Sequence, residues 1–250
     1  MHFEHLEDLR RSGLSDQTIR QQRFRSVPRA LVKVLLDFTF EGLLSAMLLP
    51  FANPVGGFMD HIRLKVFPPL RDAKGHSVKY LQPRASGLRL FFARATLQEA
   101  LHGDEPLWLV EGEKKSLAVA QLGLPAIGFC GIEGWHVAGS RDLLPDFEWV
   151  RLRRRRVELV PDGDWQTNPN VSRGAFGLAE ASSSLTSQSR DDTELLHQRM
   201  AKRPGKSRTA LKAISVELGP SPAGGSRRRR RRLVHEAQLL QPAVQPPPSP

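Results

Sequence analysis

The sequence predicts an α/β fold: a parallel sheet with helices, preceded by a small helical and antiparallel β region and followed by a disordered basic tail. Three observations support this prediction. Short apolar runs alternate with helical stretches after residue 105, apolar and charged residues alternate between 55 and 92, and every Phe, Trp and Tyr lies before residue 181. We therefore expect three parts, 1–104, 105–181 and 182–250.

The first part is predicted to combine two short helices with a small sheet. Ser12-Gly13 is a natural end for a first helix, and Ser15 has the chemistry of an N-cap for a second one. Residues 30–48 show no clear pattern. From 62 to 92, runs of alternating apolar and charged residues lie between Pro and Gly clusters, which is typical of antiparallel strands.

The second part is predicted to contain parallel βαβ units, because helical stretches alternate with three short apolar runs. The apolar runs are 107–110, 125–129 and 157–160, and the helical stretches are 116–122, 141–147 and 172–181. In an open parallel sheet, ligands bind beyond the carboxyl ends of the strands. Residues just after these runs are therefore the candidates for a site.

Acidic residues follow two of the three apolar runs. Glu111 ends the first, and Asp162 and Asp164 follow the third with Gly163 between them. Side chains two residues apart in an extended chain leave the same face, and two converging carboxylates repel unless a cation lies between them. Oxygen ligands of this kind suit Mg²⁺, and Glu111 could then serve as general acid or base. The alternative is a polar turn after a strand.

Two motifs in this order resemble a Toprim domain, the metal-binding fold of bacterial primases, topoisomerases and some nucleases. They are Val110-Glu111-Gly112-Glu113-Lys114-Lys115 and, about fifty residues later, Val160-Pro161-Asp162-Gly163-Asp164. The closer resemblance, over residues 4–180, is to Toprim-like domains of unknown function in primase or helicase proteins of phages, plasmids and other mobile elements. The resemblance implies that Glu111 is the general acid/base and that Asp162 and Asp164 bind Mg²⁺ or Mn²⁺.

Basic residues near these motifs are candidates for binding nucleic acid or phosphate. The candidates are Lys114, Lys115, Arg153, Arg154, Arg155 and Arg156. The alternative is that they are solvated surface residues. Trp135, Trp149 and Trp165 are open to two interpretations, base stacking or burial in the core.

The last part differs sharply in composition from the rest. After residue 180 the chain holds 13 Lys and Arg against five Asp and Glu, and it lacks aromatic residues. Such a segment buries too little apolar area to offset the entropy of ordering, so we expect disorder. An abrupt change of this kind is also what a frame shift or truncation in a GC-rich gene would produce.

These observations predict a cytoplasmic protein of nucleic-acid metabolism, with DNA or RNA and nucleotides as partners. Primase-type nucleotidyl transfer or nuclease action is the enzymatic hypothesis. The alternative is a catalytically silent module that binds DNA or docks a replicative helicase, or a truncated product. The most apolar stretch, 43–52, is about half as long as a membrane span, and a single cysteine excludes an internal disulfide.

Overall fold

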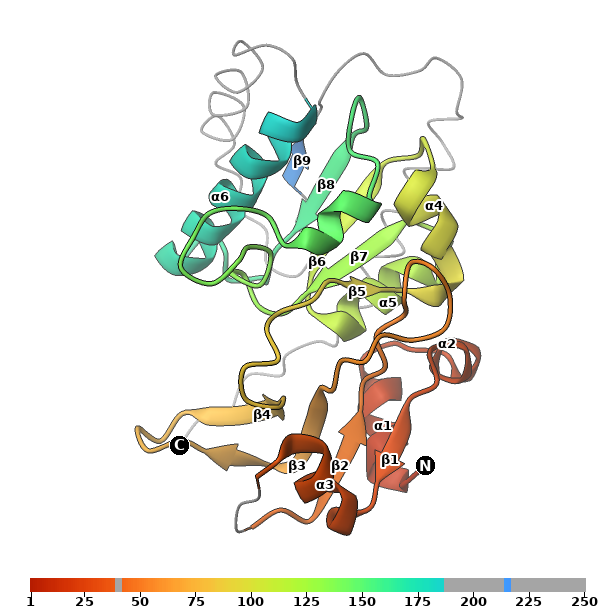
Figure 1. The fold of residues 1–250 in the computed structure, drawn as a ribbon, viewed down its shortest axis with the longest axis vertical. Helices are drawn as coiled ribbons and strands as arrows, with labels where there is room; N and C mark the ends of the chain where they lie inside the picture. The colour runs from red at the N-terminus through yellow and green to blue at the C-terminus, as the bar shows by residue number, and fades with distance from the viewer. Residues whose placement is uncertain (39–41, 187–213, 217–250) are drawn as a thin grey trace, which may run out of the picture.

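A computed structural model of the chain describes residues 1–38, 42–186 and 214–216. These residues form two sheets, one above the other in Figure 1. The first is antiparallel with the order β1-β2-β3-β4, and the second has the order β5-β7-β6-β8-β9 with three parallel strands at its centre. The predicted α/β class with a parallel sheet is confirmed.

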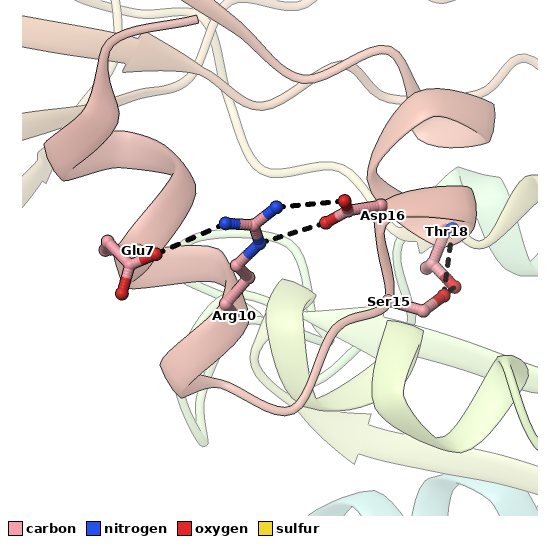
Figure 2. A network of polar contacts seen from close by, with 5 residues as sticks. All are labelled: Glu7, Arg10, Ser15, Asp16 and Thr18. Atoms are coloured by element: carbon pink, nitrogen blue, oxygen red, sulfur yellow. Dashed lines mark hydrogen bonds and ion pairs between the residues drawn. The ribbon is translucent and has the colours of Figure 1, made fainter.

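The chain begins with the predicted pair of helices, α1 (Phe3–Arg11) and α2 (Asp16–Gln22). The Ser15 hydroxyl accepts a hydrogen bond from the Thr18 backbone N–H, so this residue is the N-cap that its chemistry predicts. The Arg10 guanidinium donates to both carboxylate oxygens of Asp16, at 3.0 and 2.9 Å (Figure 2). These contacts fix the turn between the two helices.

The first sheet consists of β1 (Arg25–Val27), β2 (Ser45–Leu48), β3 (Leu64–Arg71) and β4 (Ser77–Leu81), and α3 (Arg29–Leu36) packs against it. The antiparallel pairing of β3 with β4 confirms the pattern seen in the sequence. The region 30–48, which showed no clear pattern, contains α3 and β2. All four residues of β2 are buried, so this strand has no polar face to produce alternation.

The second sheet is built around the parallel strands β6 (Leu107–Glu111), β7 (Ala126–Phe129) and β8 (Val157–Val160). These are the three strands that the apolar runs predict. Two short antiparallel strands complete the sheet, β5 (Phe91–Phe92) beside β7 and β9 (Ile214–Val216) beside β8.

Three local predictions need correction. Residues 91 and 92 were expected in the first sheet, but they pair with Ile127 and Gly128 in the second, because alternation alone does not specify a partner strand. The stretch 141–147 does not form an α-helix; a 3₁₀ helix, η2 (Pro145–Trp149), lies there instead. Residues 214–216 form β9 within a segment that was expected to lack structure, and 187–213 and 217–250 lie outside the described residues.

Helices cover both faces of the second sheet. The 3₁₀ helix η1 (Arg94–Thr96) leads into α4 (Leu97–His102), and α4, η2 and α6 (Pro169–Thr186) pack on one face, where Leu107 and Leu109 point. The other face, with Trp108 and Val110, is covered by α5 (Glu113–Ala120) together with α1 and α2. Because both faces are buried, the strands are continuous apolar runs.

The described residues contain no helix that is long and apolar enough to cross a membrane.

Candidate functional site

The strand order places the predicted acidic residues at a switch point of the sheet. From β6 the chain passes through α5 to β7 on one side, and it then returns past β6 to β8 on the other side. The carboxyl ends of β6 and β8 therefore lie next to each other where the two connections diverge, which is the usual place for a ligand in open α/β sheets. Glu111 ends β6, and Asp162 follows β8 by two residues.

A glycine allows the chain to turn directly from β6 into α5 at this edge. Gly112 has a φ of 100°, a conformation that side-chain-bearing residues rarely adopt, and its N–H donates to the Phe129 carbonyl at 2.8 Å. Because α5 starts at Glu113, the first turn of this helix lies directly beside Glu111.

The Glu111 carboxylate is buried and holds the two strand ends together. Its Oε2 accepts a hydrogen bond from the Asp162 backbone N–H at 2.8 Å. Burial is the main cause that raises the pKa of Glu111; the Asp164 carboxylate raises it further, while Lys115 and the Ile132 N–H lower it. A carboxylate with a raised pKa exchanges protons closer to neutral pH, which suits a general acid or base.

The two aspartates each have a polar partner, and these partners differ. Asp162 is half-buried and forms an ion pair with the ammonium of Lys115. Asp164 is exposed, and its Oδ2 accepts a hydrogen bond from Asn168 Nδ2 at 2.9 Å. The sequence predicts that the two carboxylates converge on one point. In the structure they make separate contacts instead, Asp162 with a lysine and Asp164 with an amide.

The donor chemistry of the site fits a hard divalent cation, since all three acidic side chains offer oxygen. Within the described part of the chain, however, no group of three or more His, Cys, Asp or Glu residues is close enough to hold a metal ion. The ammonium of Lys115, which lies against Asp162, supplies positive charge to this site.

Burial lowers the pKa of Lys115, whereas the Glu111 and Asp164 carboxylates raise it. The ammonium is thus within electrostatic range of Glu111 and Asp164 as well as paired with Asp162. Lys115 is the one basic candidate that the structure brings to the acidic residues by a direct contact.

Lys114, its neighbour, points elsewhere. Its Nζ lies 3.0 Å from the Asp8 carboxylate of α1, and its side chain is only 17% exposed. Lys114 therefore connects α5 to the N-terminal part, which is a structural contact and not the open phosphate-binding position that the sequence suggested.

The arginine run lies at the opposite edge of the sheet. Residues 153–156 precede β8, and the four residues of β8, about 13 Å long, separate them from Asp162. The expectation that this run lies beside the acidic residues is therefore wrong, because a strand carries its two flanking segments to opposite edges. Arg153 and Arg154 are exposed there, and Arg156 forms an ion pair with Glu158 at 2.6 Å.

Arg155 is buried and has a structural role. Its guanidinium donates to the backbone carbonyls of Glu99, Ala100 and Glu105, at 2.5, 2.6 and 2.8 Å. The first two carbonyls belong to α4, so the arginine ties this helix to the segment before β8.

The sequence left two interpretations of the tryptophans open, base stacking and burial in the core, and the three residues differ in their exposure. Trp135 is completely buried in the core between η2 and α6, and Trp165 is half-buried. Trp149 is 47% exposed. Burial explains Trp135, and Trp149 has a surface that could stack on a base.

Sequence reasoning missed the partners of the site residues. The Asn168 contact has a local signal, since this residue follows Asp164 by four positions and stands just before Pro169 at the start of α6. The pairing of Lys114 with Asp8 joins segments 106 residues apart, and no local pattern indicates it.

A separate groove of about 1210 Å³ lies between η2 and α6. Its walls carry apolar groups such as Phe147 and Phe176 and charged ones such as Arg141 and Arg173, and the three acidic site residues do not line it.

The chain matches no curated protein. Among solved structures, it is similar to a DnaG primase catalytic domain bound to ssDNA, with 15% identity, a TM-score of 0.48 and coverage of 86% of this chain and 73% of the other. It is also similar to the Aquifex aeolicus primase (zinc-binding and RNA polymerase domains), with 15% identity, a TM-score of 0.46 and coverage of 72% of this chain and 48% of the other. Residues 99–190, which include the parallel strands and the three acidic residues, match the model of the family described as a domain of unknown function, DUF3854.

Proposed function

We propose that this protein is a Toprim-like, divalent-metal-dependent protein of nucleic-acid metabolism that acts on a phosphate ester of a nucleotide, DNA or RNA. The observation that carries the proposal is the meeting of Glu111 and Asp162 at the switch point, joined by a 2.8 Å hydrogen bond, with Asp164 two residues further on. Primase-type nucleotidyl transfer or strand cleavage, in the replication of a mobile element, is the activity that this set of residues supports best.

Each residue has a defined task in this proposal. Asp162 and Asp164 hold Mg²⁺ or Mn²⁺, and the cation, when bound, neutralises charge on the phosphate oxygens. Glu111 moves a proton to or from a hydroxyl or phosphate oxygen, a task for which its raised pKa is suited. Its hydrogen bond to the Asp162 N–H keeps the general acid/base next to the metal-binding loop.

The proposal is tested with the full chain by titrating Mn²⁺ calorimetrically, with and without a single-stranded DNA oligonucleotide. Asp162→Asn and Asp164→Asn are expected to lose Mn²⁺ binding while remaining folded. Asp60→Asn, which alters an exposed aspartate in the N-terminal part, serves as the control and is expected to bind like wild type. Equal Mn²⁺ affinity in all four proteins would contradict the proposal and leave the two aspartates as a polar turn.

A second candidate function is favoured by the ion pair between Lys115 and Asp162, which gives the site positive charge without a metal. In this case the protein is a catalytically silent module that holds DNA or docks a replicative helicase. This alternative predicts that the protein binds single-stranded DNA equally well in EDTA and in Mn²⁺ and that it turns over no nucleotide or DNA substrate. Binding that requires Mn²⁺, or any turnover, would exclude it.

A further inference from the structure

Lys115 occupies an unusual place for a lysine. It lies in the first turn of α5, where the helix dipole disfavours positive charge. Its side chain nevertheless reaches across to the loop after β8 and pairs with Asp162, and the two side chains are 39% and 44% exposed. Lys114, which precedes it, points to Asp8 instead, so the position of Lys115 is not a general property of this helix end.

The surroundings of this ammonium are acidic. Glu111 and Asp164 both act on its pKa, and Asp162 is its direct partner. Three carboxylates at one edge of a sheet repel one another unless a positive charge is present. Asp164 accepts a hydrogen bond from the neutral amide of Asn168, whereas the ammonium of Lys115 carries a positive charge that offsets this repulsion.

We propose that Lys115 is an internal counter-ion of the acidic site, which holds Asp162 in the metal-free protein and must leave it when a divalent cation binds. This inference rests on the proposed metal-binding function. It adds that Lys115 competes with the cation for the Asp162 carboxylate. The ammonium of Lys115 contacts Oδ1 of Asp162, and a cation bound by the same carboxylate would lie within a few ångströms of it, where two positive charges repel. The long, flexible stem of a lysine allows the ammonium to move away without any change in the backbone.

The first test compares Mn²⁺ binding by the full-length wild type, Lys115→Met and Lys114→Met. Methionine keeps an unbranched apolar stem of similar length and removes the charge. We expect Lys115→Met to bind Mn²⁺ about fivefold more tightly, because the cation no longer has to break an ion pair that is partly exposed to solvent. Lys114→Met is the matched control on the same helix turn, and its Mn²⁺ affinity is expected to equal that of wild type.

The second test is a double-mutant cycle of Lys115→Met and Asp162→Asn, in which unfolding by urea is measured in EDTA and in saturating Mn²⁺. A favourable coupling between the two residues is expected in EDTA, and it is expected to disappear in Mn²⁺. The cycle reports the ion pair without relying on any activity. No coupling in EDTA, or the same coupling in both solutions, would overturn the inference.

The outcomes separate this inference from the proposed function. If wild type binds Mn²⁺ and Lys115→Met binds it no more tightly, the counter-ion role is overturned and the metal-dependent function remains. If Lys115→Met binds Mn²⁺ and wild type does not, the result supports competition between the Lys115 ammonium and the cation for Asp162. If neither protein binds Mn²⁺, both the displacement and the metal-dependent function fail.

Discussion

At the scale of single residues, Glu111 combines a structural contact with the chemistry proposed for it. The carboxylate accepts the Asp162 N–H, and burial raises its pKa at the same time. A glutamine in this position keeps an oxygen that can accept the same hydrogen bond, but it cannot exchange a proton at neutral pH. The two tasks of the residue are therefore separable by one substitution.

We predict that Glu111→Gln lowers turnover by about 10²–10⁴-fold, the usual contribution of a general acid or base. Mn²⁺ affinity and the midpoint of urea unfolding are expected to change little, because Asp162, Asp164 and the hydrogen bond remain. The measurement is single-turnover kinetics with a nucleotide or DNA substrate, with Mn²⁺ calorimetry on the same preparations. Unchanged turnover would remove Glu111 from the mechanism.

The residue types of the site could be predicted from sequence, whereas their partners could not. Glu111 directly follows the apolar run 107–110, and Asp162 and Asp164 lie shortly after the run 157–160, so an acidic residue after an apolar run is a local signal. The ion pair of Lys115 with Asp162 joins residues 47 positions apart, so it depends on the strand order β7-β6-β8 and not on any local pattern.

At the scale of elements, the close packing of α5 on β7 depends on a glycine. A Cβ placed on Gly128 would lie 2.6 Å from the Ser116 hydroxyl oxygen and 3.1 Å from its Cβ. This close approach brings the first turn of α5 to the edge of the sheet that carries Glu111.

We predict that Gly128→Ala lowers the free energy of unfolding by about 1–3 kcal/mol, the usual effect of overpacking. Gly163→Ala is the matched control, because a Cβ at Gly163 meets nothing within 4 Å, and its stability is expected to stay close to that of wild type. Urea unfolding followed by circular dichroism measures both. Equal stability of the two variants would mean that α5 moves aside without cost.

Arg155 gives the second element-scale prediction. Its guanidinium donates to the backbone carbonyls of Glu99, Ala100 and Glu105, so Arg155→Ala removes three hydrogen bonds, of which the one to Ala100 is buried. We expect the free energy of unfolding to fall by about 2–3 kcal/mol. The neighbouring exposed residue provides the comparison: Arg153→Ala is expected to change stability by less than about 0.5 kcal/mol. If Arg153→Ala lowers the free energy of unfolding in denaturant more than Arg155→Ala does, the structural role of Arg155 is refuted.

Helices and strands could be predicted from the sequence where an apolar run was continuous or where a capping residue marked the start of a helix. The three parallel strands are continuous apolar runs, and Ser15 marks the start of α2. The two residues of β5 are too few to form a pattern, and β2 lies inside the longer apolar stretch 43–52, within which nothing marks the ends of a four-residue strand. Their position is set by packing between distant segments.

At the scale of the whole molecule, a layer of buried and half-buried charges joins the first sheet to the α5 side of the second. Asp8 of α1 pairs with Lys65 of β3 and with Lys114 of α5, and Arg63 pairs with Glu113 at 2.8 Å. One apolar cluster also contains residues of both parts, Leu9 and Met47 together with Val110 and Leu117 among them. We therefore expect the two sheets to unfold as one cooperative unit, although the sequence suggested a boundary near residue 104.

Lys65 allows this layer of charges to be tested through pH. Burial is the main cause that lowers its pKa from 10.5 to about 8, and Lys114 lowers it further while Asp8 opposes the change. Between these two pH values the unfolded chain still holds the proton on Lys65 and the folded protein has released it. Stability attributable to this residue therefore rises as pH increases from about 8 to 10.5, and it is flat at lower pH, where both states are charged.

We predict that the difference in unfolding free energy between wild type and Lys65→Met shifts in favour of wild type across this interval. Taking the difference removes the contribution of Tyr80, whose pKa burial raises and which is present in both proteins. Lys74→Met, which alters an exposed lysine in the turn between β3 and β4, is the control, and its difference from wild type is expected to stay constant. The measurement is urea unfolding at intervals from pH 7 to 10.5. If the Lys65→Met difference is as flat as that of the control, the ammonium of Lys65 is solvated, and the layer of charges between the two sheets is open to water.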